Sequence, residues 1–421
     1  MTAPTFDCAI VGAGPAGSAT AIHLASAGLN VALLDRAAFP RPKPCGDCIS
    51  PGANRLLERL GVLDRVQSHA AALHGWRIHS PSGACFEARF DRIANDAIFA
   101  QAYAIDRVYL DALLLDEARN AGATWISPAH VHAITPEHRF HRVRYHDADH
   151  VEHEIRCSLL IGADGLRSIV SRRCGLVGRA PRLRKLSLTA HARVVRNIDD
   201  CGELHVIDGA CLGVAPVENR DRPHQPLCNI TLVVDSKRFA RDVAADATSF
   251  FLAMLRRFPA IAPRITDEAP GLLLGSGPFD RPVRSVVAPG VALVGDAAGY
   301  FDPFTGQGLY QSFAAAEHLA EHANTAFRAG LQRNALHGFA RDHAAIVNGS
   351  RRLQQIIDRV CTRPAVMNRA VRAFADAPHA ALRLSAVTGD LLPVRSLLSP
   401  NVALTFLSRF IAAETHSAYD R

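Results

Sequence analysis

The chain has 421 residues, 48% of them hydrophobic, so it is long enough for two domains with a sizeable core. Its 47 lysines and arginines exceed its 40 aspartates and glutamates, which gives a net charge of +7 spread along the chain. Nucleic-acid binding would need a concentrated basic face with interleaved aromatic side chains, so we expect no nucleic-acid partner. A modest positive charge suits an anionic cofactor or a carrier protein instead.

Targeting signals and metal motifs are missing from the sequence pattern. No secretory leader precedes the first strand pattern, and no run of about 20 apolar residues could span a membrane. The ten cysteines have neither the spacing of a disulfide framework nor that of a zinc site. We therefore expect a cytoplasmic protein with reduced cysteines, no metal and no transmembrane segment; the oligomeric state stays open.

The first 35 residues have the pattern of a dinucleotide-binding βαβ unit. An apolar run at 6–11 predicts a buried strand and leads into GAGPAG, a G-x-G-x-x-G segment. Gly12 permits the tight turn, Gly14 lets a pyrophosphate approach the backbone, and Gly17 lets helix and strand pack closely. Asp35 ends the next strand, where a carboxylate can bind ribose hydroxyls. We predict NAD or FAD rather than NADP; a glycine-rich turn in an ordinary βαβ unit is the alternative.

Two later segments repeat the arrangement of a strand followed by glycines. GADG at 162–165 follows an apolar strand pattern, and GDAAGYFDPFTGQG at 295–308 follows another at 291–294. The second segment runs into a helical pattern from about Leu309, so its backbone N–H groups can face a carbonyl or an anion. Three such sites in one chain suit a single large cofactor that is contacted at several points.

With RVYLDALLLDEARNAGA at 107–123, these motifs resemble the FAD-dependent monooxygenase superfamily of the para-hydroxybenzoate hydroxylase type. The most similar branch holds geranylgeranyl-reductase-like and halogenase-like enzymes, and the resemblance covers about the first 320 residues. It implies bound FAD, with NAD(P)H as external reductant. It also implies these cofactor-binding residues: Gly12, Gly14, Ala16, Gly17, Asp35, Arg36, Cys45, Arg107, Val131, Asp164, Gly295, Asp296, Gly306, Gln307 and Gly308.

The chain departs from the family pattern at three places. Ser171 stands where an arginine usually follows the middle motif, which makes the contact with a nicotinamide cofactor less certain. The halogenase tryptophan signature is absent, so a true halogenase is not expected. GACLGVAPV at 209–217 replaces the aromatic-rich substrate motif of the geranylgeranyl reductases with small residues.

The loop RPKPCGDCISPG at 41–52 carries the candidate catalytic residue Cys45. The resemblance places a cysteine of this loop near the flavin, as a proton donor or a gate. A loop that merely closes over FAD is an equal alternative, and a redox pair with Cys48 stays open. Pro303 is the second catalytic candidate because it stiffens the loop in front of the flavin. We expect the substrate pocket to be lined by Gly213, Tyr300, Phe301 and Phe304, with ordinary packing as the alternative.

The predicted fold is α/β. A Rossmann-like FAD-binding domain is interrupted by a β-sheet substrate domain and followed by a C-terminal helical region. The amphipathic segment at 402–413 could dock on the core, cap the pocket or contact a membrane surface. The expected limits are 1–75, 101–185 and 276–320 for the FAD-binding domain, 76–100 and 186–275 for the substrate domain, and 321–421 for the helical region.

Histidines gather between residues 130 and 153, where polar and apolar residues alternate. This pattern predicts an antiparallel hairpin in which many of the histidines face solvent. No carboxylate stands beside them at a recognisable ligand spacing, so the sequence does not predict a metal site there.

The favoured function is an FAD-dependent monooxygenase that uses NAD(P)H and O2 to hydroxylate or epoxidise a bulky aromatic or polyketide-like small molecule, free or carrier-bound, in secondary metabolite biosynthesis. Small residues around Gly213 suggest the roomy pocket that such a substrate needs. One alternative is an O2-independent FAD-dependent reductase of an isoprenoid-type carbon–carbon double bond. Another is a flavin redox sensor without turnover that uses Cys45 and Cys48.

Overall fold

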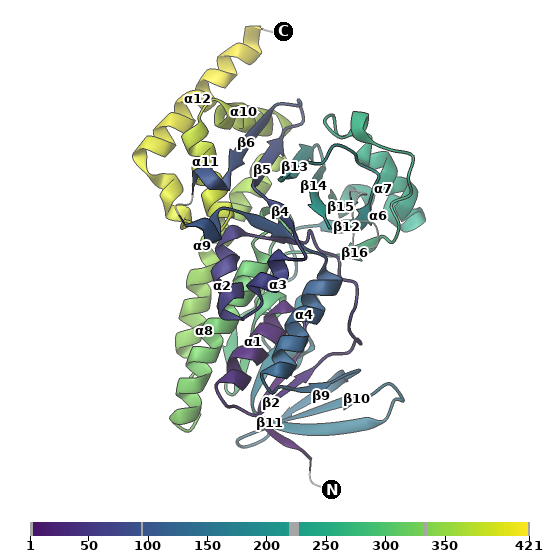
Figure 1. Ribbon diagram of the computed structural model, residues 1–421, viewed down its shortest axis with the longest axis vertical. Helices are drawn as coiled ribbons and strands as arrows, with labels where there is room; N and C mark the ends of the chain where they lie inside the picture. The colour runs from purple at the N-terminus through teal and green to yellow at the C-terminus, as the bar shows by residue number, and fades with distance from the viewer. Residues whose placement is uncertain (1–2, 94–95, 219–226, 332–334, 420–421) are drawn as a thin grey trace.

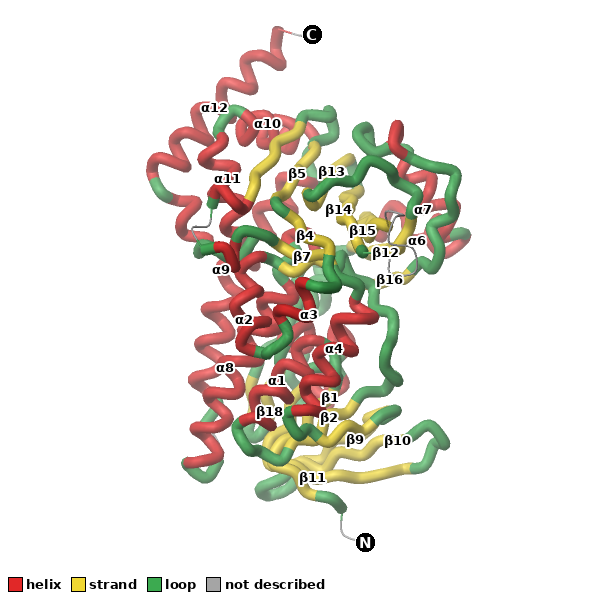
Figure 2. The backbone as a smooth tube through the Cα atoms, in the orientation of Figure 1, coloured by secondary structure: helices red, strands yellow, loops and turns green. Residues whose placement is uncertain are grey.

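The computed structural model describes residues 3–93, 96–218, 227–331 and 335–419. It has a mixed α/β fold (Figure 1), in which one sheet and its helices form the lower part and a second sheet lies above them. Figure 2 shows long helices along one side and the C-terminal helices gathered at the top. The predicted fold class is therefore confirmed, whereas the predicted domain limits stay a prediction.

The first sheet has the order β17-β18-β11-β1-β2-β8, with β10 paired to β11 and β9 to β10. Strands β18, β11, β1, β2 and β8 run parallel. Val11 is in register with both Gly162 and Leu34, and Gly162 with Leu293, so these four strands end at one edge. The strands are β1 (Thr5–Val11), β2 (Val31–Leu34), β8 (Thr124–Ile126), β9 (His130–Pro136), β10 (His141–His146), β11 (Glu152–Gly162), β17 (Val287–Ala288) and β18 (Val291–Leu293).

This register explains why glycine motifs far apart in the sequence act together. Each of the loops beginning at residues 12, 35, 163 and 295 leaves the same edge of the sheet. In parallel α/β sheets, ligands bind in the crevice outside the carboxyl ends of the strands. The antiparallel pairing of β9, β10 and β11 also confirms the hairpin predicted for the histidine-rich segment.

Helices pack beside this sheet and begin at the same edge. Helix α1 (Pro15–Ser26) contacts both α4 (Arg107–Asn120) and α8 (Gly308–Arg328). The side chain of Asp106 caps α4 by accepting a hydrogen bond from the N–H of Val108. The short helices are α2 (Asn54–Arg59), α3 (Leu63–Gln67) and α5 (Ile169–Arg173).

The second sheet has the order β16-β12-β15-β14-β13-β5-β6. An apolar cluster joins one face of its β12–β14 part to helix α7, and α6 follows β15 directly. The opposite face turns toward the edge of the first sheet. The elements are β5 (Gly75–His79), β6 (Cys85–Arg89), β12 (Lys185–Ala192), β13 (Cys201–Ile207), β14 (Ala210–Val217), β15 (Leu227–Asp235), β16 (Leu274–Ser276), α6 (Ser236–Ala245) and α7 (Ala247–Leu255).

A three-stranded sheet and four helices complete the described chain. Helix α12 docks on α10, with the rings of Phe406 and Phe374 4.5 Å apart, so the expected docking is observed, while contact of this segment with a membrane surface stays a prediction. Among the described residues, no helix is long and apolar enough to cross a membrane. These elements are β3 (Cys48–Ile49), β4 (Ala71–Leu73), β7 (Ala102–Ala104), α9 (His337–Cys361), α10 (Pro364–Ala375), α11 (Pro378–Thr388) and α12 (Pro400–Tyr419).

Candidate active site

A large cavity lies where the carboxyl edge of the first sheet faces the second sheet. Its volume is about 1140 Å³, and residues of both sheets and of α9 and α11 line it. Cavities for drug-sized ligands measure roughly 300–1,000 Å³, so this one has room for a larger ligand or for two ligands side by side.

The glycines of the first motif form a cradle at one end of the cavity. Gly12 has a φ of +102°, and a Cβ added to it would lie 2.4 Å from the carbonyl oxygen of Ala163. A Cβ at Gly17 would lie 1.8 Å from the carbonyl oxygen of Gly12. At Gly14 only the Arg41 guanidinium comes within 4 Å of such a Cβ, so open space remains above the first turn of α1. This geometry fits a pyrophosphate at the helix N-terminus.

Asp35 is fixed beside this cradle and lines the cavity together with Arg36. One oxygen of its carboxylate accepts a hydrogen bond from the N–H of Ala13 at 2.8 Å, and the other accepts one from the N–H of Ala37 at 2.9 Å. Each oxygen can accept a further hydrogen bond, so the carboxylate fits the hydroxyls of a ribose. Val131 lines the cavity as well.

The loop that begins at Gly295 lies against the first turn of α1. Gly295 has a φ of +58°, and a Cβ there would lie 2.7 Å from the Cβ of Ala16. This close approach holds Asp296 at the cavity wall, near the pyrophosphate cradle. Asp164 of the middle motif also lines the cavity, where it accepts a hydrogen bond from the N–H of Ile169 at 2.5 Å. Burial raises the pKa of Asp164.

The turn before α8 presents backbone rather than side chains to the cavity. Gly306 is left-handed, with a φ of +69°, and a Cβ at Gly306 or Gly308 would meet open space. The side chain of Gln307 instead donates hydrogen bonds to the carbonyl oxygen of Val387 at 3.2 Å and to Asp390 at 2.6 Å. These two bonds use the side-chain nitrogen, so the backbone of Gln307 and its side-chain oxygen, which has no hydrogen-bond partner among the described residues, remain to face a cofactor. Such a helix start suits the ring edge of a flavin, on which negative charge develops during reduction.

The loop that carries Pro303 is tied to the second sheet by an ion pair that the sequence analysis did not single out. Asp302 accepts a hydrogen bond from the N–H of Phe304 at 2.9 Å and one from Lys185 of β12 at 2.7 Å. The ammonium of Lys185 also lies 2.5 Å from Asp358 of α9. This buried lysine joins the loop, the second sheet and the C-terminal helices at the cavity. The residues proposed for the substrate pocket, Gly213, Tyr300, Phe301 and Phe304, all line the same cavity.

Cys45 lies between α4 and the second sheet. Its carbonyl oxygen accepts a hydrogen bond from the amide of Asn229 at 2.7 Å, and its Sγ accepts one from the N–H of Asp47 at 3.4 Å. Burial raises the pKa of the Cys45 thiol, although the Arg107 guanidinium opposes the shift. Arg107 is itself buried and forms two hydrogen bonds to Asp111, at 2.6 and 3.0 Å. The Cys45 side chain is therefore a protonated thiol on the wall of the cavity.

Sequence reasoning missed a polar cluster next to Cys45. The carboxylate of Asp47 accepts hydrogen bonds from His191 of β12 at 2.5 Å and from Asn229 of β15 at 2.8 Å. Thr231 adds a hydrogen bond of 3.0 Å to the side-chain oxygen of Asn229. The local signal was a single amide in LCNITLVVD and a single imidazole in LSLTAHA, both strand patterns with apolar residues at alternate positions. A lone polar residue in a buried strand needs a partner, and here that partner is Asp47.

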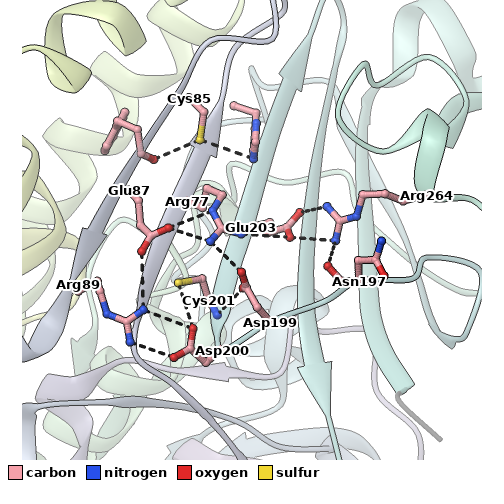
Figure 3. A network of polar contacts seen from close by, with 12 residues as sticks. Arg77, Cys85, Glu87, Arg89, Asn197, Asp199, Asp200, Cys201, Glu203 and Arg264 are labelled. Carbon is pink, nitrogen blue, oxygen red and sulfur yellow. Dashed lines mark hydrogen bonds and ion pairs between the residues drawn. The ribbon is translucent and has the colours of Figure 1, made fainter.

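A second polar network spans strands β5, β6 and β13 (Figure 3). The ring of His205 in this network lies against Phe258 of the apolar cluster with α7, so the network is on the face away from the cavity. The centre of the network is Glu203, which accepts hydrogen bonds from Arg264 at 2.7 and 3.0 Å. His79 and His205 place ligand-type atoms within 4.8 Å of the Glu203 carboxylate. Because the arginine already uses both carboxylate oxygens, this network is a buried ion pair rather than an open ligand set.

Together, the glycine cradle, the fixed Asp35 and the α8 turn define an FAD-type dinucleotide site, and its residues fit that cofactor. The model of the FAD binding domain family matches residues 5–231. The chain therefore belongs to this family of FAD-dependent oxidoreductases. The individual cofactor contacts named above stay predictions.

Curated relatives include several reductases. The chain is 29% identical over 327 residues to digeranylgeranylglycerophospholipid reductase 2 of Methanopyrus kandleri, covering 76% of each chain. It is 29% identical to the menaquinone reductase of Mycobacterium tuberculosis, covering 72% of each chain. It is also 27% identical to kynurenine 3-monooxygenase of Stenotrophomonas maltophilia, over 74% of this chain and 70% of that one.

Solved structures show the same fold at low sequence identity. A flavoprotein/dehydrogenase from Cytophaga hutchinsonii superposes with a TM-score of 0.82 at 17% identity, covering 99% of this chain and 100% of that one. The FAD-dependent myxobacterial chondrochloren halogenase superposes with a TM-score of 0.76 at 20% identity, covering 97% of each.

Proposed function

We propose that the protein is an FAD-dependent reductase that saturates a carbon–carbon double bond in an isoprenoid-type chain. The observation that carries the proposal is the protonated Cys45 thiol on the wall of the cavity that the turn before α8 also lines. Saturating a double bond needs one hydride and one proton. Reduced FAD supplies the hydride, and Cys45 is placed to supply the proton.

The wall opposite the cofactor loops supports an apolar substrate. Trp76 and Ile78 of β5, Leu204 of β13 and Val233 of β15 come from three strands of the second sheet, and all line the cavity. Apolar side chains of this kind bind alkyl groups by excluding water. Gly213 on the central strand β14 leaves room between them.

The relatives move the preference away from the monooxygenase favoured on sequence alone. Six of the curated relatives are named as reductases of geranylgeranyl lipids or of menaquinone. Both kinds of substrate are large and apolar, as is the cavity wall. In this proposal the enzyme works in the cytoplasm with NAD(P)H as external reductant, and its domains have the limits expected from the sequence.

The monooxygenase stays the second candidate because kynurenine 3-monooxygenase is also a relative. In that case NAD(P)H and O2 would lead to hydroxylation or epoxidation of a bulky aromatic molecule at the same cavity. The third candidate, a redox sensor built on Cys45 and Cys48, has less support. Burial raises the pKa of both thiols, and a protonated thiol is a poor nucleophile for disulfide exchange.

One experiment separates these candidates. The FAD-loaded protein is reduced with dithionite without oxygen and mixed with a digeranylgeranyl phospholipid or with menaquinone, and the products are analysed by mass spectrometry. The reductase predicts a product heavier by two hydrogen atoms for each saturated bond. The monooxygenase predicts no change without oxygen and, with NAD(P)H in air, peroxide or a product heavier by one oxygen atom. Protein that cannot be loaded with FAD would contradict all three candidates.

A further inference from the structure

A chain of three ionisable side chains leads from the cavity to the surface beside Cys45. It consists of Asp47, His191 and Asp106, whose side chains are 2%, 28% and 39% exposed. Asp47 lines the cavity, and Asp106 caps helix α4. The imidazole lies between the two carboxylates, with Nε2 2.5 Å from Asp47 and Nδ1 3.6 Å from Asp106.

The backbone around Asp47 fixes its carboxylate in this position. Asp47 has a φ of +58°, a left-handed conformation that is uncommon for residues other than glycine. Its carbonyl oxygen accepts a hydrogen bond from the N–H of Ile105 at 3.0 Å. On the other side, Asn229 donates to the carboxylate at 2.8 Å and to the carbonyl oxygen of Cys45 at 2.7 Å. These hydrogen bonds fix the loop with Cys45 and Asp47 against the second sheet.

The charges around the pair allow both groups to exchange a proton. Burial raises the pKa of Asp47, while hydrogen bonds from His191 and Asn229 and the charge of Arg107 oppose the shift. Burial alone would lower the pKa of His191, but the hydrogen bond to Asp47 and the charge of Asp106 raise it overall. Both groups therefore hold a proton more readily than they would in water, and the 2.5 Å contact between them gives the proton a path.

We propose that Asp47 and His191 form a proton relay that resupplies the cavity from bulk water; this rests on the proposed reductase function. The relay starts once the S–H bond of Cys45 has broken and its proton has bonded to the substrate carbon that does not receive the hydride. Protonated Asp47 then gives its proton to the Cys45 thiolate. The Asp47 carboxylate takes the Nε2 proton of His191 while Nδ1 takes a proton from bulk solvent, and the imidazole returns to its Nε2–H tautomer by proton exchange with solvent before the next turnover. One proton enters for each proton delivered, and the hydride from reduced FAD carries both electrons.

The position of His191 supports this direction of transfer. Its neighbours across β12 and β15, Thr189, Asn229 and Thr231, line the cavity, whereas the His191 ring is behind Asp47 and partly exposed. A histidine placed for substrate binding would face the cavity itself. Here the buried carboxyl faces the cavity and the imidazole faces water, which is the order that a relay needs.

The test compares His191→Gln and Asp47→Asn with His205→Gln, a histidine change on the opposite face of the same sheet. We expect the first two variants to bind FAD and to be reduced by dithionite like the wild type. They should form the saturated product at least about tenfold more slowly from the digeranylgeranyl phospholipid. Imidazole in the buffer should restore part of the rate of His191→Gln. The rate of this variant should also lose the pH dependence that titration of His191 gives to the wild type. His205→Gln should keep the wild-type rate.

A second measurement tests the relay even if the reductase proposal fails. If the wild type does not saturate the phospholipid, proton uptake during anaerobic photoreduction of the bound FAD is followed with a pH-indicator dye in unbuffered solution. The relay predicts slower uptake in His191→Gln and Asp47→Asn than in His205→Gln. Equal rates in all four proteins, or lost activity that imidazole does not restore at any pH, would overturn the relay.

Discussion

Two pairs of a buried carboxylate and an imidazole lie on opposite faces of the second sheet. On the cavity face, Asp47 and His191 are 2.5 Å apart; on the outer face, Glu203 and His205 are 2.8 Å apart. The faces differ because side chains alternate along β13: Leu204 lines the cavity, whereas the ring of His205 lies against Phe258 of the apolar cluster that α7 forms with the sheet. Both carboxylates are almost fully buried. Each pair is a carboxylate and an imidazole at hydrogen-bond distance. The two pairs differ in the other side chains that contact the carboxylate.

Glu203 has an arginine partner and Asp47 does not. Arg264 donates to both oxygens of Glu203, and Arg77 lies 3.7 Å away (Figure 3). Burial would raise the pKa of Glu203, but the hydrogen bonds from His205 and Arg264 lower it to about 2. Within the described part of the chain, the side-chain donors to Asp47 are an imidazole and an amide, and burial raises the pKa of Asp47. A carboxylate held by arginine stays charged and stabilises the fold, whereas one held by weaker donors can exchange a proton.

The largest expected effect is on stability at the outer face. Glu203→Gln leaves Arg264 buried without its anion, so we expect the free energy of unfolding to fall by about 3 kcal/mol. Asp47→Asn, the matched change on the cavity face, should alter it by less than about 1 kcal/mol because the amide oxygen can still accept the hydrogen bonds from His191 and Asn229 and no arginine loses its anion. Urea denaturation of both variants measures the difference. Equal losses would remove the distinction between the two pairs.

The pH dependence of stability sharpens the same comparison. The folded-state pKa of Glu203 is about 2, below the ordinary value of 4.5. Its contribution is therefore fully present above pH 4.5 and is lost as the pH falls through 2. The stability gap between wild type and Glu203→Gln should close over that window. A gap that persists at the acid end would show that packing, and not charge, carries the effect.

The next effect is on catalysis and concerns two thiols. Cys45→Ala removes the proposed proton donor, so product formation should fall about 100-fold. Cys85→Ala on the outer face, where the thiol lies 3.7 Å from His79, should leave the rate unchanged. Both rates come from anaerobic turnover of the digeranylgeranyl phospholipid. Retention of the wild-type rate by Cys45→Ala would exclude Cys45 as the donor.

The smallest effect concerns the outer histidine. His205→Gln removes one hydrogen bond to Glu203 and leaves the arginine in place, so unfolding should become easier by only about 1 kcal/mol. Thermal denaturation measures this change. A loss as large as that of Glu203→Gln would show that the imidazole, rather than Arg264, holds the carboxylate.

Local patterns were enough to predict the cofactor part of the molecule. Each of Gly12, Asp164 and Gly295 follows its own apolar strand, and parallel pairing brings the three loops to one edge. Asp47 could not be predicted in the same way. Its partners His191 and Asn229 are 144 and 182 residues away along the chain, and only the pairing of β12 with β15 brings those two together. The sequence analysis singled out neither pair, and in the structure the position of Arg264 separates Glu203 and His205 from Asp47 and His191.

Anaerobic turnover tests the central claim most directly. The FAD-loaded protein, reduced with dithionite and mixed with a digeranylgeranyl phospholipid in the absence of oxygen, is predicted to yield a lipid with two more hydrogen atoms for each saturated bond. An unchanged lipid under these conditions, together with an oxygenated product formed from NAD(P)H in air, would contradict the claim and establish the monooxygenase.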